Sequence, residues 1–132
     1  MTTPIQEMYG EMITEVIGLE PESREVVIKT DSGKTFTFYH EQDCCEYVTL
    51  YDIDGEVENL VGGFVMWAEA RSERATGRFS FYESGTWTFY DIQTSKGYVW
   101  MRWLGESNGY YGEGVTVRCD FQDENKEPVY YY

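Results

Sequence analysis

Two runs rich in β-branched and aromatic residues, Thr86–Thr94 and Gly97–Gly105, meet at the short turn segment Ser95-Lys96-Gly97. Two such runs joined by a tight turn containing glycine are the clearest β-hairpin signal in the chain. Further runs of the same kind are Met12–Glu20, Arg24–Thr30, Thr35–Glu41, Glu46–Ile53, Phe64–Glu73 and Val115–Phe121. Because these runs are short and closely spaced, we expect a mainly β fold.

The predicted architecture is a single twisted antiparallel sheet that curls into a half-barrel or small sandwich, with one or two short helices. The helical segments expected are near Pro4–Met12 and Val57–Leu60. A length of 132 residues predicts a single domain, 1–132. Residues 122–132 are polar and then aromatic, which indicates a flexible or a docked tail. Residues 74–85 are expected to form a hairpin loop or a flap.

The chain carries 24 acidic and 10 basic residues, a formal net charge of −14. Its averaged field repels nucleic acids and anionic membranes and favours basic partners. The Lys and Arg residues are scattered singly, so no basic groove for direct nucleic-acid binding is predicted. No apolar run reaches the roughly 18 residues of a membrane span, and the N-terminus lacks a signal-peptide pattern. Three cysteines, two of them adjacent, do not form a disulfide framework, and they favour a reducing cytoplasm.

The segment "YHEQDCCEYV" holds the only histidine, His40, with Asp43, Cys44, Cys45 and Glu46. Zinc sites usually separate paired cysteines by two to four residues, so no metal is predicted here. On a strand, adjacent cysteine side chains point to opposite faces, and we expect one sulfur to enter the core. A thiolate-imidazole nucleophile is an open alternative to a plain strand end.

The predicted hairpin concentrates aromatic side chains around Arg102. By alternation, Trp87 and Phe89 share a face, and Arg102 opposes Trp103. An arginine among rings can stack on a planar ligand or pair with a phosphate, whereas cross-strand aromatic pairs also stabilise a sheet without any ligand. Ser107-Asn108-Gly109 predicts a tight turn, whose N–H groups could also bind an anion.

Three segments carry a family resemblance: "HEQDCCE", "TWTFY" and "RWLGESNGYY". The chain resembles an uncharacterised domain of unknown function that is common in bacteriophage genomes, over about Ile13 to Val117. This resemblance implies a phage origin and the host cytoplasm as location, and it brings no known activity. The positions that match its motifs are His40, Asp43, Cys44, Cys45, Glu46, Trp87, Arg102, Trp103, Ser107, Asn108, Gly109, Tyr110 and Tyr111.

The leading hypothesis is a phage anti-defence protein, a non-enzymatic and oligomeric sponge that sequesters a nucleotide-derived immune messenger without cleaving it. No cofactor, metal or catalytic residue is predicted. The first alternative is an acidic nucleic-acid mimic or protein inhibitor that binds a basic host or defence protein; the second is a hydrolase of such a messenger. The predicted ligand-binding residues are His40, Asp43, Glu46, Trp87, Arg102, Trp103, Ser107, Asn108, Gly109, Tyr110 and Tyr111.

Overall fold

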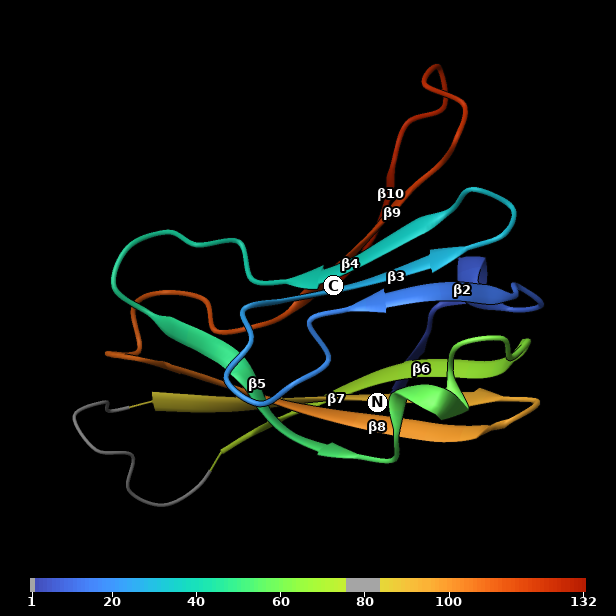
Figure 1. The fold of residues 1–132 in the computed structure, drawn as a ribbon. Coiled ribbons are helices and arrows are strands. Elements are labelled where there is room, and N and C mark those ends of the chain that lie inside the picture. The colour runs from blue at the N-terminus through green and yellow to red at the C-terminus, as the bar shows by residue number, and fades with distance from the viewer. Residues whose placement is uncertain (1, 76–83) are drawn as a thin grey trace.

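The computed structural model describes residues 2–75 and 84–132 and consists of two antiparallel five-stranded sheets packed face to face (Figure 1). The lower sheet in Figure 1, called the front sheet, has the order β1-β6-β7-β8-β5. The upper sheet, called the back sheet, has the order β10-β9-β4-β3-β2. The front strands are β1 (Thr2–Pro4), β5 (Tyr47–Asp54), β6 (Val65–Arg74), β7 (Ser84–Thr94) and β8 (Gly97–Ser107). The back strands are β2 (Ile13–Ile17), β3 (Glu25–Thr30), β4 (Thr35–Tyr39), β9 (Thr116–Asp120) and β10 (Val129–Tyr131). The mainly β prediction is confirmed, in the form of a small sandwich.

The predicted hairpin forms the centre of the front sheet. Strands β7 and β8 pair from Thr94↔Gly97 at the turn to Ser84↔Ser107 at the far end. Gly97 has φ +148°, and a Cβ at this position would lie 2.8 Å from the Asn59 side chain. A larger residue would therefore collide with the short 3₁₀ helix η2 (Val57–Asn59), which lies where the sequence indicated a helical turn.

Alternation along the strands directs one set of side chains into a shared core. Tyr90 of β7 and Trp103 of β8 are buried on the inner face of the front sheet. Phe38 of β4 meets Tyr90 edge to face, with ring centroids 4.8 Å apart. The Tyr90 hydroxyl also donates a hydrogen bond of 3.3 Å to the Val115 carbonyl, so this tyrosine joins the two sheets.

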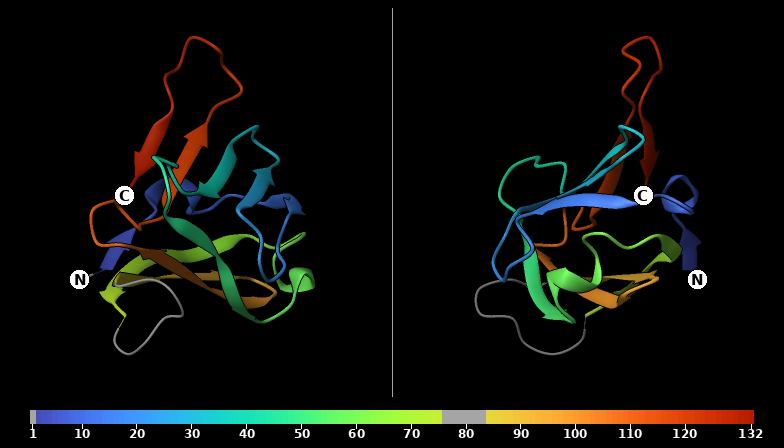
Figure 2. Two further views of the ribbon diagram at one scale, coloured as in Figure 1. Left: turned by 90° about the vertical axis from the view of Figure 1, so that its left-hand side faces the viewer. Right: turned by 45° about the vertical axis from the view of Figure 1, so that its right-hand side comes forward.

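The termini extend both sheets. Strand β1 pairs with β6 at one edge of the front sheet, and β10 pairs with β9 at an edge of the back sheet. The tail segment thus docks through Val129–Tyr131, and the β9–β10 loop projects beyond the sandwich (Figure 2). The N-terminal helical segment is a single 3₁₀ turn, η1 (Gln6–Met8). Most of the expected flap, residues 76–83, lies outside the described residues.

Candidate functional site

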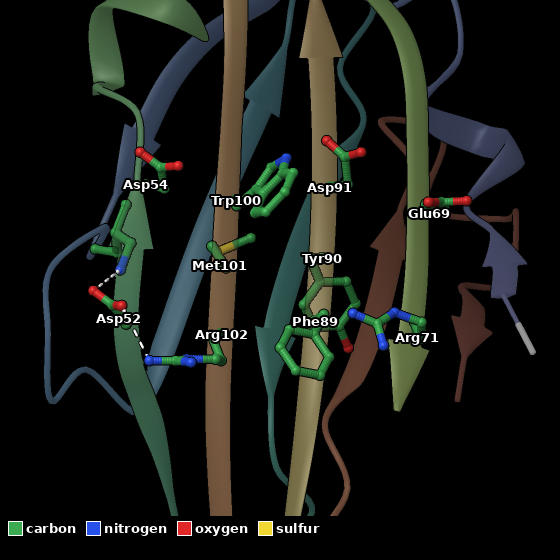
Figure 3. Close-up of a pocket in the computed structure, with 11 residues that line it drawn as sticks. Asp52, Asp54, Glu69, Arg71, Phe89, Tyr90, Asp91, Trp100, Met101 and Arg102 are labelled. Atoms are coloured by element: carbon green, nitrogen blue, oxygen red, sulfur yellow. Dashed lines mark hydrogen bonds and ion pairs between the residues drawn. The ribbon is translucent and has the colours of Figure 1, made fainter. Parts of the chain in front are cut away.

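A pocket of about 530 Å³ lies on the outer face of the front sheet, with the back sheet behind it (Figure 3). Strands β5, β8, β7 and β6 each direct side chains away from the core at this point. Because the four strands are in register, these side chains form two rows across the sheet.

The acidic row consists of Asp54, Trp100, Asp91 and Glu69. Asp54 pairs with Trp100, Trp100 with Asp91, and Asp91 with Glu69, so an indole lies between two carboxylates and a third follows. Trp100 as a whole residue is 54% exposed. Among the residues the structure describes, none of the three carboxylates has a Lys or Arg within ion-pair distance.

The remaining polar contacts of the acidic row are weak. Gln93 Nε2 donates a hydrogen bond of 3.2 Å to Asp91 Oδ2, and the Tyr98 hydroxyl lies 3.5 Å from Asp54 Oδ2. The other oxygen of Asp91, Oδ1, is buried and accepts no hydrogen bond from any described residue. A buried acceptor without a donor is destabilising, so this carboxylate can still gain from a donor.

The arginine row, one step along the strands, consists of Asp52, Arg102, Phe89 and Arg71. Arg102 Nη2 donates to Asp52 Oδ2 at 3.2 Å, and Arg71 lies with its guanidinium carbon 4.3 Å from the centre of the Phe89 ring. A separate carboxylate, Glu73, pairs with Arg71 at 3.1 Å. Both arginine charges are therefore matched by carboxylates outside the acidic row.

Arg102 also lies over aromatic rings at the edge of the pocket. Its guanidinium carbon is 4.9 Å from the centre of the Trp87 ring and 5.4 Å from that of Tyr51. The structure thus brings Trp87 and Arg102, both of them predicted ligand-binding residues, together on the outer face of the front sheet. With both arginines compensated, the three carboxylates of the acidic row give the pocket a negative charge.

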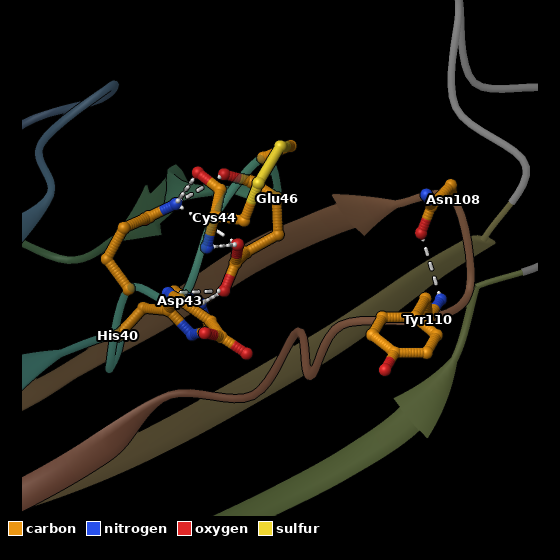
Figure 4. The surroundings of a disulfide bond; sticks show 8 residues. His40, Asp43, Cys44, Glu46, Asn108 and Tyr110 are labelled. Carbon is orange, nitrogen blue, oxygen red and sulfur yellow. Dashed lines mark hydrogen bonds and ion pairs between the residues drawn. A yellow bond between two sulfur atoms is a disulfide. The ribbon is translucent and has the colours of Figure 1, made fainter.

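A separate cluster, the His40 clasp, consists of His40 and Glu46 from the segment between β4 and β5 (Figure 4) and of Gly114 from the loop before β9. His40 Nε2 is 2.8 Å from Glu46 Oε2, and Nδ1 is 2.7 Å from the Gly114 carbonyl oxygen. Carbonyl and carboxylate oxygens only accept hydrogen bonds, so the two ring nitrogens of His40 each face an acceptor. The clasp thus ties residues 40–46 to the loop before β9.

Glu46 is the centre of the clasp, with its side chain fully buried. Burial acts to raise the pKa of Glu46, but hydrogen bonds from His40 and from the backbone N–H groups of Cys44 and Asp43 outweigh it and lower the pKa to about 2. Since His40 and Glu46 are both occupied by these contacts, their arrangement is that of a structural ion pair.

Cys44 and Cys45 are joined to each other by a disulfide bond. The prediction that they point to opposite faces, with one sulfur in the core, is wrong. Residues 40–46 form no strand, so strand alternation does not apply to them, and both cysteines are exposed. The third cysteine, Cys119, is buried in β9 as a free thiol.

The segment after β8 forms the predicted tight turn. Gly109 has φ +91°, and its N–H donates to Ser107 Oγ at 2.9 Å. The N–H of Tyr110 donates to Asn108 Oδ1 at 2.9 Å. The Ser107 hydroxyl donates to the buried Glu113 carboxylate. These polar groups serve the turn itself.

The predicted ligand-binding residues do not converge on one pocket. Arg102 lines the pocket and Trp87 lies beside it, whereas Trp103 is fully buried on the opposite face of β8. Ser107 lies five positions beyond Arg102, roughly 17 Å along an extended strand. His40, Asp43 and Glu46 lie in the clasp, and Asn108, Gly109, Tyr110 and Tyr111 lie in or beside the turn.

Most residues of the pocket were not among the predicted ligand-binding residues. Asp91 and Trp100 could have been predicted from the sequence, because strand alternation and the hairpin turn place them on the outer face. Asp54, Glu69 and Arg71 come from β5 and β6, whose pairing with the hairpin is long-range. Among the described residues, no group of three or more His, Cys, Asp or Glu side chains is arranged to hold a metal ion.

Fold and pocket together define an antiparallel β-sandwich protein with an acidic, aromatic pocket on the outer face of one sheet. Residues 6–117 match the profile of the family described as "Domain of unknown function (DUF7448)", and the chain belongs to this family. Searches of curated proteins and of solved structures found no match. No helix among the described residues is long and apolar enough to cross a membrane.

Proposed function

We propose that this protein is a non-enzymatic binding protein that captures a positively charged group of a partner on the outer face of its front sheet. The observation that carries the proposal is the acidic row, in which the exposed Trp100 lies between Asp54 and Asp91, with Glu69 next to Asp91, and no described Lys or Arg pairs with these carboxylates. A guanidinium or ammonium group placed on the indole would pair with these carboxylates.

The aromatic ring and the carboxylates both favour binding of a cation. A cation over an exposed tryptophan ring contributes about 0.5–1 kcal/mol, and each partly exposed ion pair contributes about 0.2–1 kcal/mol. The net charge of −14 raises the encounter rate with a basic partner at low ionic strength. In the phage setting that the family resemblance implies, the partner would be a basic host or defence protein, whose nucleic-acid groove the acidic face occupies.

A basic peptide probe tests this proposal. We expect calorimetry to detect binding of a nona-arginine peptide, with affinity that falls as salt rises from 20 to 200 mM. The triple variant Asp54→Asn, Glu69→Gln, Asp91→Asn removes the three pocket charges and should weaken binding by about tenfold at low salt, from roughly 0.5 kcal/mol per ion pair.

A matched control separates the pocket from overall charge. The triple variant Glu20→Gln, Glu124→Gln, Glu127→Gln removes the same number of charges from exposed positions outside the pocket. It should bind the peptide nearly as well as the unmodified protein. Equal losses in the two triple variants would mean that only net charge acts, and would contradict a specific site.

The arginine row favours a second candidate, capture of a nucleotide-like ligand. Arg71 and Arg102 lie over rings, and Arg102 Nε donates to no described residue, so phosphate contact beside a stacked base is chemically reasonable. Calorimetry against cyclic dinucleotides and ADP-ribose derivatives tests it, with Arg102→Ala as the disabling variant. Arg118→Ala is the control, because Arg118 pairs with Asp120 and lies over Tyr130 on the back sheet.

The state of any bound nucleotide separates a sponge from a hydrolase. Intact ligand recovered after heat denaturation supports sequestration, and a cleaved ligand supports the hydrolase alternative. Absence of binding by all of these nucleotides would contradict both the sponge and the hydrolase.

A further inference from the structure

The disulfide between Cys44 and Cys45 lies in the exposed connection between β4 and β5. The remaining cysteine provides an internal contrast, because Cys119 is buried in the core and burial raises the pKa of its thiol to about 11. A thiol with a raised pKa carries little reactive thiolate at neutral pH. Thiol–disulfide exchange in the folded chain is thereby confined to one exposed pair.

The disulfide-bonded pair is attached directly to the His40 clasp. The N–H of Cys44 donates to Glu46 Oε1 at 2.8 Å, and Gln42 Nε2 donates to the carbonyl of Cys44 at 3.2 Å. The same Glu46 carboxylate accepts the hydrogen bond from His40, which also contacts Gly114. The backbone conformation at Cys44 is therefore coupled to the contact between residues 40–46 and the loop before β9.

We propose that Cys44–Cys45 is a redox site that dithiols reduce, and that its reduction loosens the His40 clasp. This inference is independent of the proposed function, since the disulfide lies outside the outer-face pocket.

The chemistry is ordinary thiol–disulfide exchange. One thiolate of the dithiol attacks a cysteine sulfur, the S–S bond breaks, and a mixed disulfide forms. The second thiolate of the dithiol then displaces that cysteine and closes a cyclic disulfide. Two electrons and two protons pass to the protein, which gains two thiols. The ring that joined the two side chains opens, and the backbone at Cys44 loses this constraint.

Alkylation and mass spectrometry test the first half of the proposal, with the folded full-length chain and dithiothreitol as the dithiol. Before reduction, iodoacetamide should label no cysteine; after reduction, it should label Cys44 and Cys45 while Cys119 stays unlabelled. Labelling of Cys44 and Cys45 before reduction, or none after it, would overturn the redox site. Labelling of all three cysteines after reduction would show that the disulfide stabilises the whole fold. It would overturn the proposal that reduction acts locally on the His40 clasp.

His40 is the only histidine, so imidazole C–H signals can be assigned to the clasp without ambiguity. Reduction should shift these signals and speed hydrogen exchange of the Cys44 amide by about tenfold, as expected when one hydrogen bond is weakened. The double variant Cys44→Ser, Cys45→Ser should show the reduced-like signals with or without dithiothreitol, whereas Cys119→Ala should respond like the unmodified protein. Identical His40 signals in both redox states would overturn the coupling.

Discussion

Asp91 of β7 and Trp100 of β8 lie directly opposite each other on the outer face of the front sheet, beside Glu69 on one side and Asp54 on the other. This pairing places an exposed indole within a group of carboxylates that have no counter-cation among the described residues. The arrangement suits recognition of a cation, because the ring face and the carboxylates attract the same charge.

Replacement of Trp100 tests the contribution of the ring. Trp100→Ala should weaken nona-arginine binding by roughly two- to fivefold, the equivalent of about 0.5–1 kcal/mol for a cation on an exposed ring. The free energy of unfolding should change little, because the side chain is mostly outside the core. Tyr132→Ala removes another exposed ring, from the C-terminus, and should leave binding unchanged. If both variants bind the peptide equally well, the indole takes no part.

Removing the charge of Asp91 should stabilise the fold and weaken binding of the nona-arginine peptide. Asp91 and Glu69 are directly paired like charges, and such pairs destabilise a sheet, so Asp91→Asn should raise the free energy of unfolding by about 0.2–1 kcal/mol. The same variant should bind the peptide more weakly. Urea denaturation and calorimetry measure the two effects, with Glu127→Gln as the control. A less stable Asp91→Asn protein would show that the hydrogen bond from Gln93 outweighs the repulsion by Glu69, and would contradict this prediction.

The acidic row and the arginine row show which residues of the pocket could be placed from the sequence and which could not. The turn at Ser95-Lys96 fixes the register of the hairpin, so the placement of Asp91 and Trp100 on one face followed from alternation. The same alternation set Trp103 opposite Arg102, and in the structure Trp103 is core. Asp54 and Glu69 could not be assigned to the site, because the pairings of β5 and β6 with the hairpin depend on contacts distant in sequence.

The segment from His40 to Glu46 shows the opposite case, in which a local rule failed. Strand alternation separated the two cysteine side chains, but the carboxylate of Glu46 accepts hydrogen bonds from the backbone of Asp43 and Cys44 and stabilises a compact loop. Side chains that bond the nearby backbone in this way compete with strand pairing. No sequence pattern marks a glutamate that is buried and accepts hydrogen bonds from the backbone of its own loop.

The ionised carboxylate of Glu46 should make the free energy of unfolding fall as the pH is lowered. Its pKa is about 2 in the folded chain against an ordinary value of 4.5, so its ionised form stabilises the fold. This contribution is fully present above about pH 4.5 and is lost as the pH falls through 2. Urea denaturation at pH 7, 4 and 3 should show that Glu46→Gln is less stable at pH 7 and loses less stability on acidification. Parallel curves for the variant and the unmodified protein would contradict the ion pair.

The contact between the sheets can be tested at Tyr90. Tyr90→Phe removes the hydroxyl that donates to the Val115 carbonyl and keeps the edge-to-face contact with Phe38. We expect a loss of about 0.5–1.5 kcal/mol in the free energy of unfolding, measured by urea denaturation. Tyr51→Phe, at an exposed ring of the front sheet, is the control and should have little effect. A loss no larger than that of the control would argue against this hydrogen bond.

The most direct test of cation capture is an NMR titration with the nona-arginine peptide that follows the four tryptophan indole N–H signals. We expect that the Trp100 signal shifts most and that the core Trp103 signal stays in place. A titration in which the Trp100 signal does not move while backbone signals of the β9–β10 loop do would contradict the assignment of this face as the binding site.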